Sequence, residues 1–136
     1  MIVLNYWLVK TEPEDYSFAD LARAETDTWD GVKNRQAQKN IRSMMPGDLV
    51  FIYHTGKERA IIGVGEVASH AFTDPTDAKF SAVSIHARYK LKRPVTLREI
   101  KELPEFGDWA LVRQSRLSVM PVSEAQWQGV LRLAQS

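Results

Sequence analysis

The spacing of apolar residues along the chain predicts a series of strands with short helices between them. Aromatic and β-branched residues at 5–10 are typical of a first strand, and Pro13, which cannot donate to a strand ladder, follows it. The continuous apolar run within 48–54 predicts a strand that is buried on both faces. Further strands are expected at residues 60–70, 83–91 and 117–122.

Helix starts are marked by Ser or Thr followed three residues later by an acidic or amide residue. This capping-box pattern occurs at 17–20, 96–99 and 123–126 and predicts helices that run to about residues 24, 103 and 134. Apolar residues at helical spacing predict another helix over 34–45, which Pro46 and Gly47 end. Residues 27–33 hold Trp29 and Gly31 and are expected to form a loop.

The order of these elements favours an α+β fold within one domain that spans residues 1–136. The strands follow one another without the regular strand–helix alternation of a doubly wound fold. We therefore expect a small mixed or antiparallel sheet curled into a barrel, with helices packed outside it. Gly63 and Gly65 stand two residues apart in one predicted strand, which is typical of a bulge or of close packing against the backbone.

Composition and charge narrow the classes of function. The chain contains no cysteine, which excludes disulfides and thiolate metal sites and favours a reducing, cytoplasmic setting. No apolar run approaches the ~20 residues that a membrane span needs, and the first residues do not resemble a signal peptide, so no membrane partner is expected. The net charge is only +1. We expect a monomer, although the sequence leaves the oligomeric state open.

The positive charges are nevertheless unevenly distributed. Residues 33–42 and 86–98 hold four and five Lys or Arg residues, respectively, and no acidic residue. Two such blocks in a nearly neutral protein can form a phosphate-binding face. The alternative is that they are solvated surface, since exposed Lys and Arg need no special cause.

Motifs of common enzymes are absent from the sequence. No pair among the three histidines has the spacing of a helical zinc site, and no phosphate-binding glycine loop or nucleophile elbow occurs. We therefore expect no catalytic residue, no metal and no cofactor.

Six segments, in this order and spacing, resemble the signature of the EVE domain family. They are Tyr-Trp-Leu-Val-Lys-Thr-Glu-Pro at 6–13, Trp-Asp-Gly-Val-Lys-Asn at 29–34 with Gln-Ala at 36–37, Gly-Asp-Leu-Val-Phe-Ile-Tyr-His at 47–54, Ile-Gly-Val-Gly-Glu-Val at 62–67, Leu-Val-Arg-Gln-Ser-Arg-Leu-Ser at 111–118 and Met-Pro-Val-Ser at 120–123. Each segment is weak by itself, but together they span nearly the whole chain.

The resemblance implies a PUA-like fold and kinship with YTH domains, which hold a methylated adenine in an aromatic cage. For EVE domains it implies recognition of modified bases, in DNA particularly. Lys10, Thr11 and Trp29 occupy positions that match a Lys-Ser pair and a cage tryptophan in that kin group. The chain departs from the family at Thr11, where Ser is frequent, and at Arg35 and Gln38, where Tyr and Arg are frequent.

A pocket for a flat base needs an aromatic wall and a few polar groups at its edge. We expect Trp29 to be the wall, with a lid over the barrel mouth as its alternative. The polar tips of Tyr53 and His54 can face that mouth, although His54 fits a core histidine equally well. The other predicted binding residues are Lys10, Thr11, Val32, Asn34, Arg113 and Ser115; Asn34 is also a plausible helix N-cap.

The predicted function is therefore non-catalytic binding of a modified, flipped-out base in nucleic acid, DNA rather than RNA. An alternative is a small amidohydrolase of the ASCH type that acts on modified nucleosides through Lys10, Thr11 and Glu66. A third hypothesis is a protein-interaction surface on the last helix, where an apolar stripe also fits the core: Trp127, Val130, Leu131 and Leu133.

Overall fold

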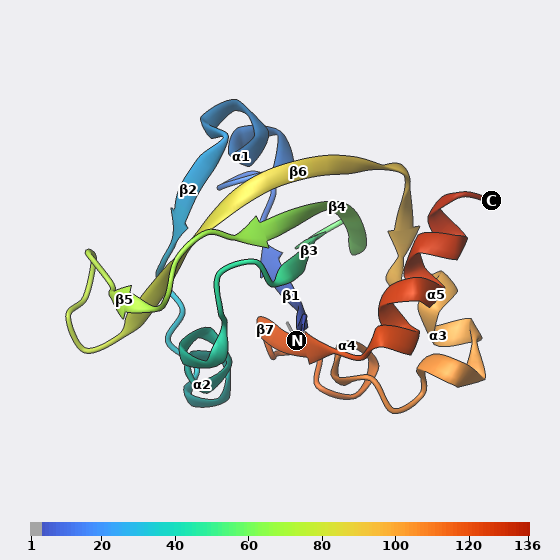
Figure 1. Cartoon of the computed structure of the whole chain (residues 1–136). Coiled ribbons are helices and arrows are strands. Elements are labelled where there is room, and N and C mark those ends of the chain that lie inside the picture. The colour runs from blue at the N-terminus through green and yellow to red at the C-terminus, as the bar shows by residue number, and fades with distance from the viewer. Residues whose placement is uncertain (1–3) are drawn as a thin grey trace.

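The computed structural model describes residues 4–136 and shows a curved sheet with helices around it (Figure 1). The strands are β1 (Tyr6–Thr11), β2 (Thr26–Trp29), β3 (Leu49–His54), β4 (Ala60–Val67), β5 (Phe72–Thr73), β6 (Ser81–Thr96) and β7 (Val119–Val122). The helices are α1 (Phe18–Ala24), α2 (Arg35–Ser43), α3 (Leu97–Glu102), α4 (Ala110–Arg113), α5 (Glu124–Ala134) and a 3-10 turn, η1 (Pro104–Phe106).

The sheet is mixed, with the order β2-β6-β4-β3-β1-β7, and β5 pairs with β6. Only the β1–β3 pair is parallel among the described strands. The segment between these two strands carries α1, β2 and α2, and a parallel pair requires a crossover of this kind. The predicted α+β fold class is confirmed.

The strand β3 shows why the centre of the sheet is stable. Residues 50–54 are all buried, as the continuous apolar run predicts. Beside it, the indole of Trp7 donates to Asp48 Oδ2 at 2.9 Å, so a buried polar pair closes one end of the core. The ring of Trp127 on α5 stacks on Phe51 at 3.8 Å between centroids. This face of α5 is therefore covered by the sheet. The apolar stripe of the last helix belongs to the core: Trp127 and Val130 are buried in it, and Leu131 and Leu133 pack against it.

All three predicted capping boxes are present, at Ser17, Thr96 and Ser123. Gly63 is also used as expected, since a Cβ there would lie 2.6 Å from the ring of Phe18. The close packing of α1 on β4 thus depends on a residue without a side chain.

Two predictions about the strands were wrong. Residues 27–33 are not a loop throughout, because Thr26–Trp29 form β2 and pair with β6. The strand β6 is much longer than the expected 83–91. Along its length it pairs with three other strands, β2, β4 and β5. Local patterns did not show these extensions because pairing with distant segments creates them.

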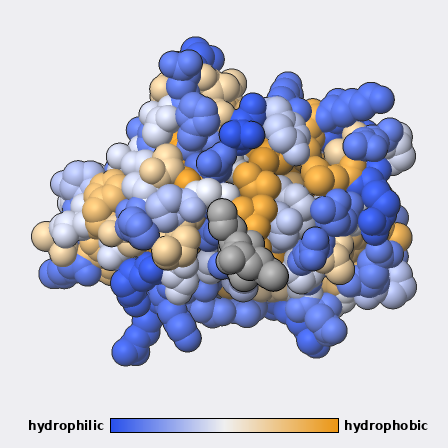
Figure 2. All heavy atoms as spheres, viewed as in Figure 1, coloured by the Kyte–Doolittle hydropathy of each residue, from blue (hydrophilic) through white to orange (hydrophobic). Residues whose placement is uncertain are grey.

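Hydrophilic side chains cover most of the face seen in Figure 2, with an apolar strip near its centre. The large exposed hydrophobic residues are Leu4, Met45, Phe72 and Tyr89. Within residues 4–136, no helix is both long and apolar enough to cross a membrane. The same residues contain no group of three or more His, Asp or Glu side chains that is placed to hold a metal ion.

Candidate functional site

A cavity of about 430 Å³ opens where the ends of β1 and β2 approach each other. Its size lies within the roughly 300–1,000 Å³ range of small-ligand pockets. Four of the predicted residues line it, Lys10, Thr11, Trp29 and Val32, although they come from separate segments of the chain. The remaining lining residues are Tyr16, Asp27, Thr28, Asp30, Gly31, Lys33 and Ser118.

Trp29 is the last residue of β2 and is 7% exposed. Its ring meets that of Tyr16 edge-to-face, with centroids 6.0 Å apart. Trp29 is therefore not a free-standing platform on a loop. It forms a packed wall of the cavity, held by strand pairing with Val83 and by Tyr16.

Tyr16 and Asp27 form a fixed polar pair at the cavity. The phenol donates to Asp27 Oδ2 at 2.5 Å, and Asp27 Oδ1 accepts the backbone N–H of Thr28 at 2.8 Å. Burial, together with the carboxylates of Asp27 and Asp20, raises the pKa of Tyr16, so the phenol remains a donor. Both oxygens of Asp27 are thus engaged.

The segment after Trp29 is held by Asp74, which is 2% exposed. Its Oδ2 accepts the N–H of Gly31 at 2.8 Å, and its Oδ1 accepts bonds from both the N–H and the hydroxyl of Thr76. Gly31 adopts φ 72°, which favours glycine. Burial and the neighbouring charges of Asp74 and Asp27 raise the pKa of Asp30, which lies on the cavity wall.

Lys10 connects the cavity with the segment after α4. Its ammonium donates to the carbonyl of Ser115 at 2.9 Å and lies 5.4 Å from the centroid of the Tyr53 ring. Burial lowers the pKa of Lys10. The hydroxyl of Thr11 donates to the carbonyl of Tyr16 at 2.6 Å, so its proton is already used and only its lone pairs can serve a ligand.

Gln38, which is 3% exposed, fixes the other side of residues 30–34, the cavity loop between β2 and α2. Its amide nitrogen donates to the carbonyls of Val32 and Ser81 at 2.6 and 3.0 Å, while its oxygen accepts the N–H of Ser81 at 2.8 Å. One side chain thus joins α2, the cavity loop and β6. The departure from the family at this position has a structural use in this chain.

Asn34 caps α2, since its Oδ1 accepts the N–H of Ala37 at 2.9 Å. It does not line the base-sized cavity. With Arg113 and Ser115 it lines a shallow groove of about 300 Å³ instead. The other residues of this groove are Gln36, Gln114, Arg116 and Leu117, so it contains two arginines and no carboxylate.

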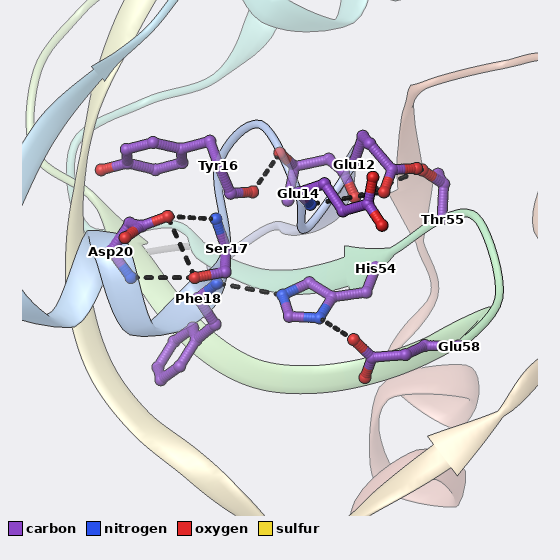
Figure 3. A network of polar contacts seen from close by, with 10 residues as sticks. Glu12, Glu14, Tyr16, Ser17, Phe18, Asp20, His54, Thr55 and Glu58 are labelled. Carbon is purple, nitrogen blue, oxygen red and sulfur yellow. Dashed lines mark hydrogen bonds and ion pairs between the residues drawn. The ribbon is translucent and has the colours of Figure 1, made fainter.

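The structure places His54 away from the cavity beside Trp29. As Figure 3 shows, its ring lies between the backbone of Phe18 and the side chain of Glu58, with its nitrogens 3.0 Å from each partner. His54 is buried and lines a different cavity of about 710 Å³ between α1 and β6. Tyr53, 3% exposed, lies beneath Lys10 instead of at an open mouth. The expectation that both tips face one mouth was wrong.

The residues of the alternative amidohydrolase are not brought together. Glu66 forms a salt bridge with Arg88 at 2.8 Å. In the sheet it stands opposite Leu49, which pairs with Tyr6, whereas Lys10 pairs with Tyr53. Four residues along β1 correspond to about 13 Å, and one whole strand, β3, lies between the strands that carry Lys10 and Glu66. The geometry therefore offers no Lys–Thr–Glu constellation.

Comparison with known families identifies the family to which this chain belongs. The family model for the EVE domain matches residues 5–133, and the chain belongs to that family. It is 29% identical to mouse thymocyte nuclear protein 1 over 97% of this chain and 74% of that protein.

Solved structures show the same fold. The protein Rpa0253 of Rhodopseudomonas palustris has a TM-score of 0.91 and 40% identity, covering 97% of this chain and 94% of its own. Human THYN1 in complex with DNA containing 5-methylcytosine has a TM-score of 0.90 and 27% identity, covering 97% and 98%. An ASCH protein from Zymomonas mobilis, at 14% identity and a TM-score of 0.56, is similar in fold alone.

Sequence reasoning missed Tyr16, Asp27 and Asp30 as cavity residues. Asp30 stands inside the segment 29–34, and that position was the signal that could have found it. Tyr16 lies in a turn before α1 with no local motif around it. Only the approach of β1 to β2 brings it against Trp29.

Proposed function

We propose that this chain binds DNA and holds one modified base, flipped out of the stack, in the cavity beside Trp29. The observation that carries the proposal is the cavity itself, which places an indole, a phenol and several edge-reading polar groups around a space for one heterocycle. The binding of 5-methylcytosine DNA by a relative that matches nearly the whole chain supports DNA as the partner.

The aromatic wall supplies only part of the affinity. Stacking contributes roughly 1–3 kcal/mol per base, and flipping a paired base costs a few kcal/mol, so the two nearly cancel. Contacts with phosphates must provide most of the remainder. Lys33 at the cavity, Arg35 on α2 and Arg116 in the neighbouring groove are exposed, and none forms a salt bridge within residues 4–136.

Arg116 lines the shallow groove next to the cavity, Lys33 and Arg35 are the sequence neighbours of Asn34, which also lines it, and the groove has no carboxylate to repel a phosphate. We therefore assign the groove to the strand on one side of the flipped base. In this proposal Asn34, Arg113 and Ser115 serve the backbone of the nucleic acid, while Lys10, Thr11, Trp29 and Val32 serve the base. Lys10 joins the two regions through its bond to Ser115.

The test is a titration, followed by fluorescence anisotropy, of oligonucleotides that carry 5-methylcytosine or cytosine at one position. We expect saturable binding that weakens with salt. One extra buried methyl contributes about 0.8 kcal/mol, which corresponds to roughly fourfold. The Trp29→Ala variant should lose about tenfold or more, while Trp29→Phe retains most of the affinity.

Circular dichroism and thermal unfolding must show that both variants fold, because Trp29 is buried. Lys101→Gln, on the exposed side of α3, is the matched surface control. Affinity that is equal in Trp29→Ala and Trp29→Phe would place the base elsewhere.

A further inference from the structure

We propose that the carboxylate of Asp30 selects bases that carry an exocyclic amine, of the cytosine or adenine type, over thymine and uracil; this inference rests on the proposed function. Asp30 directly follows the indole that forms the cavity wall, and it lines the same cavity. An aromatic face and an acceptor for the edge of a base are thus adjacent in the chain.

Asp30 is the carboxylate of the cavity wall that remains available. Both oxygens of Asp27 are engaged, by the hydroxyl of Tyr16 and the N–H of Thr28. Asp30 is exposed, and within residues 4–136 its carboxylate has a hydrogen bond only from its own backbone N–H. It therefore retains lone pairs for a ligand.

The position of Asp30 is fixed although its side chain is not. On one side, Trp29 is paired with Val83 in the sheet. On the other side, the N–H of Gly31 donates to the buried Asp74. A carboxylate between two anchored residues can read a ligand without first ordering a loop.

A carboxylate in such a place discriminates by hydrogen-bond polarity. The amine of cytosine or adenine donates to an Asp or Glu oxygen, whereas the O4 of thymine is an acceptor. Two acceptors facing each other, away from water, leave both groups unsatisfied. Lys10 cannot provide this discrimination by contacting the O2 atom, because cytosine and thymine share it.

Thymine and 5-methylcytosine form a matched pair of probes. Both carry the 5-methyl group and differ at the 4-position, which bears oxygen in one and an amine in the other. We expect the wild-type chain to prefer an oligonucleotide with 5-methylcytosine over the same oligonucleotide with thymine by about tenfold or more. In Asp30→Asn, whose amide can donate to O4, the ratio should fall to within about threefold.

Glu105→Gln, an exposed carboxylate on η1, removes the same charge far from the cavity loop and should leave the ratio unchanged. If Asp30→Asn keeps the wild-type ratio while Trp29→Ala loses binding to both oligonucleotides, the role of Asp30 is overturned and the proposed function stands. If the wild-type chain binds neither oligonucleotide at low salt, both are overturned. A wild-type preference for thymine overturns the role of Asp30 alone.

Discussion

The Nε2 atom of His54 accepts a hydrogen bond from the backbone N–H of Phe18 at 3.0 Å. This bond ties the end of β3 to the first turn of α1, where backbone N–H groups have no partner within the helix. The other ring nitrogen lies 3.0 Å from Glu58 Oε1. His54 thus holds α1 in place, and Tyr16, two residues before Phe18, is positioned at the cavity.

We therefore predict that His54→Leu destabilises the fold by about 1–3 kcal/mol, because it leaves the N–H of Phe18 buried without an acceptor. Urea unfolding followed by circular dichroism measures this change. Glu58→Gln, which alters only the half-exposed partner, should cost much less. A His54→Leu chain as stable as the wild type would show that the bond adds nothing to stability.

Gly63→Ala should destabilise the chain by about 1–3 kcal/mol, since the new methyl would overlap the ring of Phe18. The double variant Gly63→Ala with Phe18→Leu removes the overlapping ring atoms. A thermodynamic cycle of the four proteins should therefore show a favourable coupling between the two substitutions. Additive effects would indicate that the ring moves aside freely.

The salt dependence of DNA binding tests the assignment of the phosphate groove. Replacing Lys33 and Arg116 by Gln should lower the slope of log affinity against log salt by about 2, since each phosphate contact contributes about 0.9. Binding should weaken similarly for oligonucleotides with cytosine and 5-methylcytosine, because phosphate contacts carry no base preference. The Lys101→Gln control should keep the wild-type slope, and an unchanged slope in the double variant would remove the groove from the interface.

The Arg93–Glu99 pair predicts how stability responds to acid. Hydrogen bonds from the Arg93 guanidinium, helped by those from the Thr96 capping box, lower the pKa of Glu99 from 4.5 to about 2. Because the folded pKa lies below the unfolded value, this stabilisation is present above pH 4.5 and is lost as the pH falls toward 2.

Glu99→Gln should therefore cost roughly 1–2 kcal/mol at pH 7 and little near pH 2. Denaturant unfolding of both proteins across this pH range measures the difference. A gap between wild type and variant that stays constant with pH would assign the effect to the cap alone.

Patterns that act over a few residues could be predicted from the sequence. The capping boxes at Ser17, Thr96 and Ser123 are local hydrogen-bond arrangements, and the structure contains all three. The continuous apolar run of β3 likewise required burial on both faces. Lys10, Thr11, Trp29 and Val32 were also found from the sequence, through resemblance to a family and not through local physics.

Contacts between distant segments could not be predicted in this way. The residues 26–29 are polar apart from Trp29 and become a strand only because β6 offers a partner. Likewise, His54 follows Tyr53 at the end of β3, but its ring accepts a hydrogen bond from α1 and does not line the cavity beside Trp29.

The sequence by itself determined where α1, α2, α3 and α5 begin, that β3 is largely buried and which family the chain belongs to, because these follow from short-range hydrogen bonding, hydrophobic periodicity and motif order. Tertiary structure alone decided that Tyr16 lies against Trp29, that both oxygens of Asp27 accept hydrogen bonds from within the protein while Asp30 is available, and that His54 does not line the cavity beside Trp29. Each of these depends on how β1, β2 and α1 meet in space, and the free energy of that packing comes from residues far apart in the chain.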